Sequence, residues 1–340
     1  MNSRPQHPRS RLPLALTMGE PSGVGPEITL KAWMARQHEG LPPFFVIGDS
    51  ELYVSLASSL GLDISLQEIS SPEEAVAVFD TALPVLPIKL GATVVPGRLD
   101  PANSHSVMHS IDMACDLAMA EAVGGIITNP IHKRALYDAG LKVPGHTEYL
   151  SQRSGGATPV MMLSCPGLRV VPVSVHEPLR DVATSLTTAM IAEKGIILAR
   201  ALKHDFGIER PRIAVAGLNP HAGEEGHIGR EEIDIIAPAM KIIAAEEHVE
   251  LLGPLPPDTM FHGAARARYD AALCMYHDQA LIPIKTIDFE RGVNTTLGLP
   301  IIRTSPDHGT ALDIAGQGIA SPLSLLEAIK LAHKIASHRS

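Results

Sequence analysis

The sequence is poor in several features that would point to particular classes of protein. Three cysteines occur in 340 residues without a CxxC or other paired spacing, which is typical of a reduced cytoplasmic protein. Aromatic residues make up 4%, too few for a surface that stacks nucleic-acid bases. The 37 acidic residues outnumber the 28 basic ones and give a net charge of −9, which disfavours nucleic acid and anionic membrane as partners. An anionic substrate would have to be held by locally placed cations.

Long apolar runs and the commonest nucleotide and hydrolase motifs are missing as well. The basic N-terminal segment is followed by an apolar stretch, residues 14–18, that is far too short for a secretory signal or a bilayer span. We expect residues 1–11 to form a disordered tail. GxGxxG after the first strand, GxxxxGK[ST], HExxH and GxSxG are all absent, which disfavours a standard dinucleotide fold, a P-loop enzyme and a serine hydrolase.

Short apolar segments that alternate with helical segments indicate an α/β protein. The length favours two domains, and the alternation predicts a largely parallel sheet covered by helices. Residues 62–104 are rich in proline and are compatible with an edge hairpin or an irregular crossover. A helix is predicted from the apolar face of residues 107–122. The predicted strands cover residues 12–18, 44–47, 125–128, 160–164, 168–175, 213–218 and 271–275.

Three histidines directly follow predicted strands: His176, His221 and His277. Ligand sites in open α/β sheets lie beyond the carboxyl ends of the strands, so three imidazoles there would form a metal site with open positions. One such histidine alone is better explained as an ordinary loop residue, but three at equivalent places favour the metal site. Asp278 and Asp258 can fix the imidazole tautomers, although turn and helix-cap chemistry explains them almost as well.

Cations and a helix start indicate an anion site. Lys285, Arg291 and Arg303, together with Asn294, can form an anion clamp, and solvated surface charge is the alternative. Two isoleucines before Arg303 suggest that this arginine follows a strand. The segment GHTE (145–148) predicts a helix start at which Thr147 can cap and backbone N–H groups can attract phosphate; capping alone explains the same pattern.

The segment HGTALDIAGQGIASP (308–322) resembles the adenosine-binding loop of the isocitrate and isopropylmalate dehydrogenases. In those relatives the residue at the position of Asp313 accepts from a ribose hydroxyl, which favours NAD over NADP. The resemblance therefore implies that His308, Gly309, Thr310 and Asp313 bind the cofactor. Leu312 replaces the proline usual in those relatives, so the loop can be set differently here.

A second resemblance covers nearly the whole chain. Ordered motifs similar to those of the PdxA family of pyridoxal phosphate biosynthesis, the 4-hydroxythreonine-4-phosphate dehydrogenases, are TMGEPSGVGPE, TNPIHK, GHTEYL, HEPLRD, GLNPHAGEEGHIGREE, GPLPPDTMF, YHDQ and RGVNTTLGLPIIRTSPDHGTA. Ala280 after YHDQ and the basic tail depart from the family pattern without touching a proposed ligand. A branch of the family acts on phosphorylated threonate or erythronate, and GHIGREE and GPLPPDTMF are more similar to the vitamin B6 branch.

This resemblance implies a fold, a partner and roles for individual residues. The fold is the two-domain isocitrate/isopropylmalate dehydrogenase type of α/β/α sandwich, with residues 12–125 plus about 285–340 in one domain, about 126–284 in the other, and the active site in the interdomain cleft. Shared active sites in a homodimer are implied, with metal ligands from both subunits. By position, His176, His221 and His277 hold one divalent ion (Zn, Mg or Co) per subunit, and the expected substrate-binding residues are His146, Thr147, Lys285, Asn294 and Arg303. Asp258 and Asp278 fall on acidic positions that keep the site intact.

The implied reaction is the NAD-dependent oxidation of 4-phosphooxy-L-threonine, followed by loss of CO2 to give 3-amino-2-oxopropyl phosphate; NADP remains possible as cofactor. Either Lys285, acting as a neutral amine, or a metal-bound water relayed by Asp278 would serve as the general base. One alternative is a dehydrogenase for 4-phospho-D-threonate or erythronate. Others are a metal-dependent aldolase or hydrolase, which the small-residue loop disfavours, and a zinc-stabilised binding module, which leaves the cations without a role.

Overall fold

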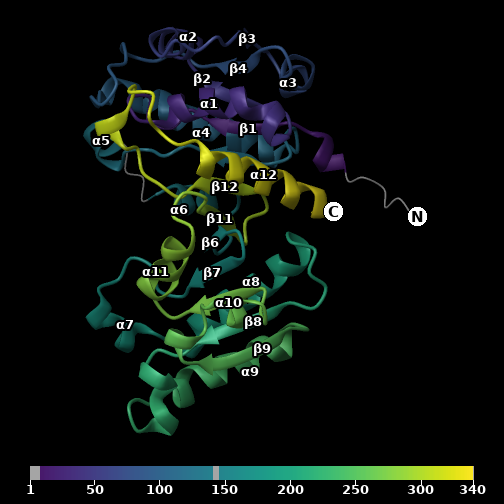
Figure 1. Ribbon diagram of the computed structural model, residues 1–340, viewed down its shortest axis with the longest axis vertical. Coiled ribbons are helices and arrows are strands. Elements are labelled where there is room, and N and C mark those ends of the chain that lie inside the picture. The colour runs from purple at the N-terminus through teal and green to yellow at the C-terminus, as the bar shows by residue number, and fades with distance from the viewer. Residues whose placement is uncertain (1–7, 141–144, 340) are drawn as a thin grey trace. The chain divides into compact units, whose positions relative to one another are not determined.

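The computed structural model describes residues 8–140 and 145–339 and divides the chain into two compact units. The first contains the chain up to Pro159 together with Leu299 and everything after it, and the second is Val160–Gly298. Both units are α/β (Figure 1). The predicted α/β class is therefore confirmed.

The sheet of the first unit has the strand order β3-β4-β2-β1-β5-β12, and every described pairing in it is parallel. Its strands are β1 (Leu14–Thr17), β2 (Phe44–Gly48), β3 (Leu66–Glu68), β4 (Leu83–Pro87), β5 (Ile126–Thr128) and β12 (Arg303–Pro306). The helices of this unit are α1 (Gly25–Glu39), α2 (Ser50–Ser59), α3 (Pro72–Val78), α4 (Ser104–Met119), α5 (Lys133–Asp138), α6 (His146–Arg153) and α12 (Leu323–His338).

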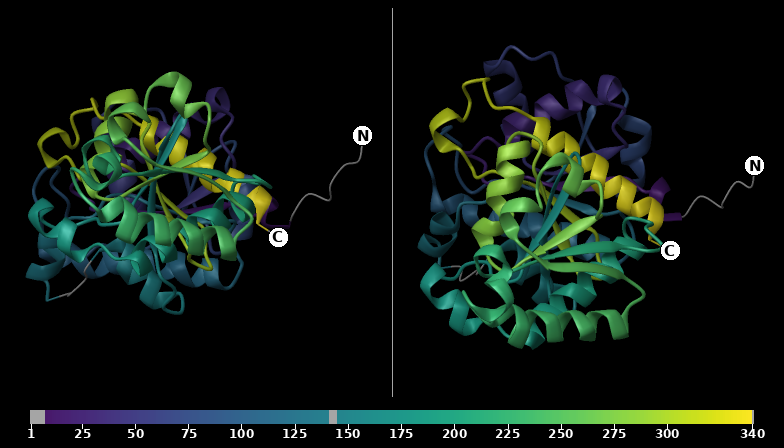
Figure 2. Two further views of the ribbon diagram at one scale, coloured as in Figure 1. Left: turned by 90° about the horizontal axis from the view of Figure 1, so that it is seen from below. Right: turned by 60° about the horizontal axis from the view of Figure 1, so that its bottom comes forward.

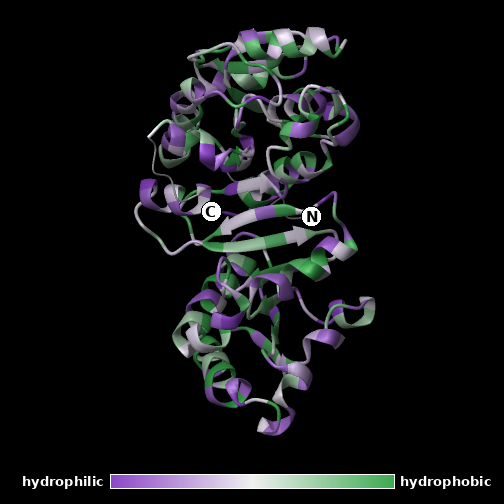
Figure 3. Cartoon of the chain, turned by 90° about the vertical axis from the view of Figure 1, so that its left-hand side faces the viewer, coloured by the Kyte–Doolittle hydropathy of each residue, from purple (hydrophilic) through white to green (hydrophobic). Residues whose placement is uncertain are grey.

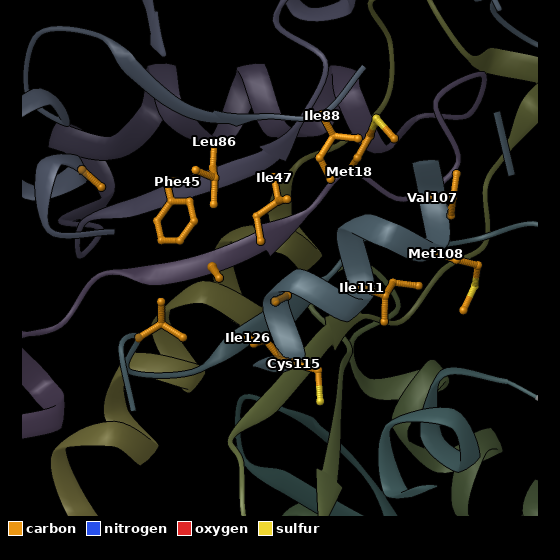
Figure 4. Packing of buried hydrophobic residues seen from close by; sticks show 14 of the residues in the cluster. Met18, Phe45, Ile47, Leu86, Ile88, Val107, Met108, Ile111, Cys115 and Ile126 are labelled. Carbon is orange, nitrogen blue, oxygen red and sulfur yellow. The ribbon is translucent and has the colours of Figure 1, made fainter. Parts of the chain in front are cut away.

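The central strands of this sheet are covered on both faces. Every residue of β1 and β2 is buried, as expected for parallel strands between helices. Helix α4 packs on β1, β2 and β5, while α12 packs on β1, β5 and β12. The predicted apolar face of α4 is confirmed: Val107, Ile111 and Cys115 belong to the same buried cluster as Phe45 and Ile47 (Figure 4).

The second unit has a mixed sheet in the order β11-β6-β7-β10-β8-β9. Strands β11 and β6 pair antiparallel, as do β6 and β7, and the other pairs are parallel. Helices α8 and α9 pack together on this unit (Figure 2). Its main elements are β6 (Val160–Cys165), β7 (Leu168–Pro172), α7 (Leu179–Ser185), α8 (Thr188–His204), β8 (Arg212–Ala216), α9 (Ala237–Glu246), β9 (Glu250–Leu255), α10 (Gly263–Arg266), β10 (Ala271–Cys274), α11 (His277–Ile287) and β11 (Val293–Leu297).

The unit boundaries differ from those expected from the sequence, which were near residues 126 and 284. Residues 126–159 belong to the first unit because β5 hydrogen-bonds to β1 and β12 rather than to any strand of the second. Residues 285–298 belong to the second unit because β11 pairs with β6 over five residues. Both unit boundaries are set by strands that pair although they are distant in the sequence. Amino-acid composition does not reveal such pairing.

Two local expectations are corrected. The proline-rich segment 62–104 is neither a hairpin nor irregular throughout: β3, α3 and β4 form a crossover in which the strands pair in parallel. Of the expected disordered tail, residues 1–11, the first seven lie outside the described part, and Pro8–Arg11 form a short 3-10 helix instead.

The helices have the mixed hydropathy that is expected of helices on the surface of a globular protein. Figure 3 shows helices that carry hydrophilic and hydrophobic residues together, as amphipathic surface helices do. Among residues 8–140 and 145–339, no single helix is long and apolar enough to cross a bilayer. Helices α7 and α8 pass that test only when they are taken together across a 95° bend.

Asp270, which precedes β10, ties two neighbouring strands of the second unit together. Its carboxylate accepts from Arg212 Nη2 at 2.9 Å and from the Arg212 backbone N–H at 2.8 Å. Burial acts to raise the pKa of the Asp270 carboxyl, but the hydrogen bonds and charge of Arg212 outweigh it and hold that pKa below its ordinary value. The contact therefore stabilises the fold when the carboxyl is ionised, above its unfolded pKa of about 4, and is lost as the pH falls through the lower folded pKa.

We predict that Asp270→Asn lowers the free energy of unfolding at pH 7 by about 1–3 kcal/mol, and that the difference from wild type shrinks toward pH 2. Urea unfolding at a series of pH values measures it. Asp234→Asn is the control, because Asp234 pairs with Arg230 while 51% and 63% of their side chains are exposed, so it should change little. A pH-independent loss in Asp270→Asn would contradict the assignment.

Candidate active site

A small cationic cavity lies in the first unit, where the chain leaves β5 and passes through β12. Its volume is about 190 Å³. It is lined by Thr128, Pro130, Ile131, Lys133, His146, Arg303, Ser305, Pro306, His308 and Gly309. The lysine, arginine and histidine side chains of this lining make it suited to an anion.

Arg303 is the most buried cation of this cavity. It is 4% exposed, and its Nε and Nη2 both donate to Thr128 Oγ1, at 3.0 and 2.7 Å. Burial lowers the pKa of the Arg303 guanidinium to about 10, and the Glu148 carboxylate acts in the opposite direction. Arg303 therefore stays charged at pH 7 in a desolvated place, where an incoming anion gains more than at the surface. Contrary to expectation, it begins β12 instead of following a strand.

His146 faces the same cavity from the first position of α6. The residue as a whole is half-buried, but its Nε2 is shielded from solvent and has no hydrogen-bond partner in the described part of the chain. Burial, followed by the positive charges of Arg303 and Lys133, holds the pKa of His146 well below its ordinary value. A neutral imidazole results, which can donate to a phosphate oxygen without carrying a charge.

The predicted helix start at GHTE is confirmed, but its cap is different. Helix α6 begins at His146, with Gly145 as N-cap and no side-chain cap hydrogen bond. Thr147 is therefore the second helical residue and not the cap. Gly145 lies close to its neighbours, because an added Cβ would come within 2.8 Å of Glu148 Oε2.

Among the cavity residues that received no anion-binding role in the sequence analysis are Thr128, Lys133 and His308. His308 was expected to bind the cofactor, and its Nε2 is buried without a partner among the described residues. The signal for the other two was the TNPIHK motif, whose threonine and lysine both line the cavity. Only the folded chain shows that Thr128 orients Arg303.

The loop after β12 contains the residues expected to bind a nucleotide. Asp313 is exposed in a short 3-10 turn, Leu312–Ile314, so its carboxylate is available to a ribose hydroxyl. Gly309 has open space at the position of a Cβ, while Thr310 is 8% exposed and bonds through its carbonyl to Val24 N. These residues fit an adenosine-binding role.

His277 and His176 come together in the second unit. His277 begins α11, separated from β10 by two residues, and its Nδ1 lies 2.7 Å from Asp278 Oδ1, which leaves Nε2 as the ring nitrogen that can bind a metal. The rings of His176 and His277 are 6.3 Å apart between centroids. His176 does not directly follow its strand as expected: β7 ends at Pro172, although ladder hydrogen bonds continue through Ser174.

His221 lies in an unusual loop. Residues 221–225 all have positive φ, between 43° and 79°, in the 3-10 segment Pro220–Gly226 that follows β8 by several residues. Glu232, 5% exposed, holds the start of this loop: its Oε1 accepts from the backbone N–H of Leu218 and Asn219 at 2.8 and 2.7 Å. In the described part of the single chain, no three His, Cys, Asp or Glu side chains gather closely enough to hold a metal ion.

The remaining expected residues are spread over the second unit. Asp258 is exposed in the turn Pro257–Thr259. Lys285 lies on α11 with its Nζ 4.8 Å from the centre of the Phe289 ring. Asn294 on β11 has a buried Oδ1 without a partner in the part of the chain that is described. Arg291 is exposed.

Comparison with known proteins gives the family. The sequence pattern described as "Pyridoxal phosphate biosynthetic protein PdxA" matches residues 41–332. This chain belongs to the PdxA family. It is 51% identical over 333 residues to the 4-hydroxythreonine-4-phosphate dehydrogenase of Caulobacter vibrioides, covering 96% of this chain and 98% of that protein. A protein of the same name from Bradyrhizobium diazoefficiens is 49% identical over 340 residues, covering 96% and 98% of the two chains.

Solved structures agree with this assignment. The crystal structure of 4-hydroxythreonine-4-phosphate dehydrogenase from Klebsiella pneumoniae superimposes with a TM-score of 0.86 at 38% identity, over 96% of this chain and 99% of that one. A terephthalate 1,2-cis-dihydrodiol dehydrogenase from Burkholderia xenovorans has a TM-score of 0.66 at 27% identity, over 95% and 98%. The resemblance to the PdxA family that was found in the sequence is therefore confirmed.

We predict that Glu232→Gln disorders the His221 loop, because Glu232 accepts from two backbone N–H groups on Oε1 and from Asn219 Nδ2 on Oε2, so an amide N–H would face a donor in either orientation. The free energy of unfolding should fall by about 1–3 kcal/mol, and amide hydrogen exchange at 218–226 should accelerate. Glu246→Gln on the exposed side of α9 is the control. Unchanged exchange in the loop would show that Glu232 does not hold it.

Proposed function

We propose that the chain catalyses the NAD-linked oxidation of 4-phosphooxy-L-threonine to 2-amino-3-oxo-4-phosphooxybutanoate, which loses CO2 to give 3-amino-2-oxopropyl phosphate. The observation that most strongly supports this function is the cationic cavity of a PdxA family member. In this cavity the buried Arg303 guanidinium is fixed by two hydrogen bonds to Thr128. The curated relatives bear the name of this dehydrogenase. Three free cysteines agree with a reducing, cytoplasmic setting.

The phosphate is assigned to the cavity of the first unit. Arg303 supplies a fixed, desolvated charge, and neutral His146 supplies a hydrogen bond. Thr147 adds a hydroxyl and a backbone N–H in the first turn of α6, where the helix dipole favours an anion. Lys285 and Asn294 are proposed as further substrate contacts, and the buried, unpartnered Oδ1 of Asn294 among the described residues is an acceptor that a substrate N–H or O–H would satisfy.

The cofactor is assigned to the loop after β12. Exposed Asp313 would accept from a ribose hydroxyl, which favours NAD over the 2′-phosphorylated NADP by charge repulsion. His308 and Gly309 line the substrate cavity and also begin this loop, so substrate and cofactor are proposed to meet there. Thr310, whose carbonyl is bonded to Val24, fixes the base of the loop.

We also propose one divalent ion (Zn, Mg or Co) per subunit, held by His176, His221 and His277 in a homodimer whose subunits share the ligands. Imidazole nitrogens suit such an ion, and Asp278 fixes the tautomer of His277. When bound, the ion lowers the pKa of the substrate hydroxyl and stabilises negative charge on its oxygen. The sharing between subunits rests on the family resemblance.

The protein residues then have defined tasks in the reaction. The C3 hydroxyl proton passes to a base, for which Lys285 or a water relayed by Asp278 is proposed, with Asp258 supporting the site. The hydride leaves C3 with two electrons and reduces the nicotinamide, so the alcohol becomes a ketone. The resulting β-keto acid loses CO2 because the electrons of the breaking bond enter the new carbonyl, and a proton completes the amino ketone.

The direct test is NADH formation at 340 nm with 4-phosphooxy-L-threonine, with and without a chelator. We expect turnover with NAD, its loss on metal removal and its return with Zn²⁺, Mg²⁺ or Co²⁺. 4-Phospho-D-threonate and 4-phospho-D-erythronate are the competing substrates. A higher kcat/KM for either would replace the proposed substrate, and full activity of the metal-free protein would remove the metal from the mechanism.

We predict that Arg303→Lys raises the KM for the phosphorylated substrate about tenfold or more and leaves the KM for NAD unchanged, because an ammonium cannot reproduce the planar, doubly anchored guanidinium. Steady-state kinetics with each substrate varied measures it. Arg200→Lys, at an arginine of α8 whose side chain is 57% exposed, is the matched control. An equal rise in both KM values would place Arg303 outside the phosphate site.

A further inference from the structure

A buried carboxylate of α1 holds the tip of the proposed nucleotide loop. Glu27, the third residue of α1, is fully buried. Its Oε1 accepts from the backbone N–H of Ala320 at 2.9 Å, and its Oε2 accepts from that of Gly318 at 3.2 Å. One side chain thus takes up two donors of a loop that lies 291 and 293 residues further along the chain.

Lys31, one helical turn later, completes the attachment. Its Nζ donates to Glu27 Oε1 at 2.9 Å and to the carbonyls of Gly318 and Ala320 at 2.8 and 2.7 Å. The pair therefore binds both the N–H and the C=O of these two loop residues. Because the lysine charge offsets the buried carboxylate, the attachment is electrically balanced.

The base of the same loop is attached to the segment that precedes α1. Val24 N donates to Thr310 O at 2.9 Å. Gly23 leaves the room for this approach, since a Cβ there would come within 2.8 Å of the Thr310 carbonyl oxygen. The motif GEPSGVGPE, which had no assigned role, thus contacts the loop at its start and, through Glu27, at its tip.

Hydrophobic packing does not explain how the loop tip is held. Gln317, Gly318 and Ile319 are exposed, with Ile319 at 65%. Gly318 has φ +75°, a left-handed backbone conformation that glycine adopts without steric cost. The hydrogen bonds to Glu27 and Lys31 hold the backbone N–H and C=O groups of Gly318 and Ala320.

We propose that Glu27 is a positioning residue for the cofactor: with Lys31, it fixes residues 316–320 in the shape that receives the adenosine half of NAD. The inference rests on the proposed assignment of the loop to the nucleotide. It adds a specific dependence of nucleotide affinity on a side chain that does not itself contact the nucleotide, and it gives the GEPSGVGPE motif a function.

The test uses Glu27→Gln in the full-length protein. The amide has nearly the shape of the carboxylate but places an N–H against a backbone donor, so one loop hydrogen bond is replaced by a repulsive contact. We expect the Kd for NAD, measured by titration calorimetry, to rise about tenfold. Amide exchange in a peptide covering 316–322 should accelerate, while the KM for the phosphorylated substrate stays unchanged.

Three further variants make the test specific. Glu39→Gln is the matched control, because Glu39 lies at the other end of α1 and pairs with Lys330, away from the loop. Asp313→Lys, at the proposed ribose contact, should weaken NAD binding without changing exchange at 316–322. Lys31→Met should reproduce the Glu27→Gln effect, and it replaces that variant if circular dichroism shows that Glu27→Gln is unfolded.

The outcomes separate this inference from the proposed function. Wild-type Kd for NAD and wild-type exchange in both Glu27→Gln and Lys31→Met would overturn the positioning role while leaving the dehydrogenase intact. Faster exchange with an unchanged Kd would likewise overturn it, because the loop would then be held without serving the nucleotide. Failure of the wild-type protein itself to bind NAD would overturn the assignment of the loop.

Discussion

Parallel pairing of β5 with both β1 and β12 is the constraint on which the site of the first unit depends. Parallel neighbours point their carboxyl ends the same way, so segments that are far apart in the sequence leave the sheet at one edge. These segments are the turn after β1 with the start of α1, the end of β5 with the chain up to Lys133, and the chain from β12 into the proposed nucleotide loop. An antiparallel arrangement would place them at opposite edges.

Burial and neighbouring charged or hydrogen-bonding groups act on each ionisable side chain of this region, and the result differs from one side chain to the next. The Arg303 guanidinium stays cationic although burial lowers its pKa to about 10, and Thr128 fixes its direction. The neighbouring His146 is kept neutral because burial and two cations lower its pKa. Glu27 remains buried because Lys31 and two loop amides satisfy it. A negatively charged protein thus maintains a local place for an anion.

Local sequence patterns correctly predicted several helices and strands and one contact of the site. Hydrophobic periodicity and the residues that begin or end helices and strands act over a few positions. They predicted the apolar face of α4, the helix start at His146 and the strands β2 and β8. Asp278 could be paired with His277 because they are adjacent. The position of Arg303 was wrong in detail, since two isoleucines before it resemble a strand but belong to the connection that enters β12. The His221 loop was also beyond sequence patterns, because the backbone at its start, Leu218 and Asn219, bonds to Glu232, 14 and 13 residues further along the chain.

The sequence by itself determined the family, the α/β class and the chemical types of residue available for an anion, a nucleotide and a metal, because motifs and apolar periods are properties of the chain as written. Only the tertiary structure decided which strands pair, hence where the units divide and which residues share a cavity. It also decided that Thr128 orients Arg303 and that Glu27 holds residues 318 and 320. The physical reason is that desolvation and hydrogen-bond satisfaction depend on what surrounds a side chain, and those surroundings come from segments more than a hundred residues apart.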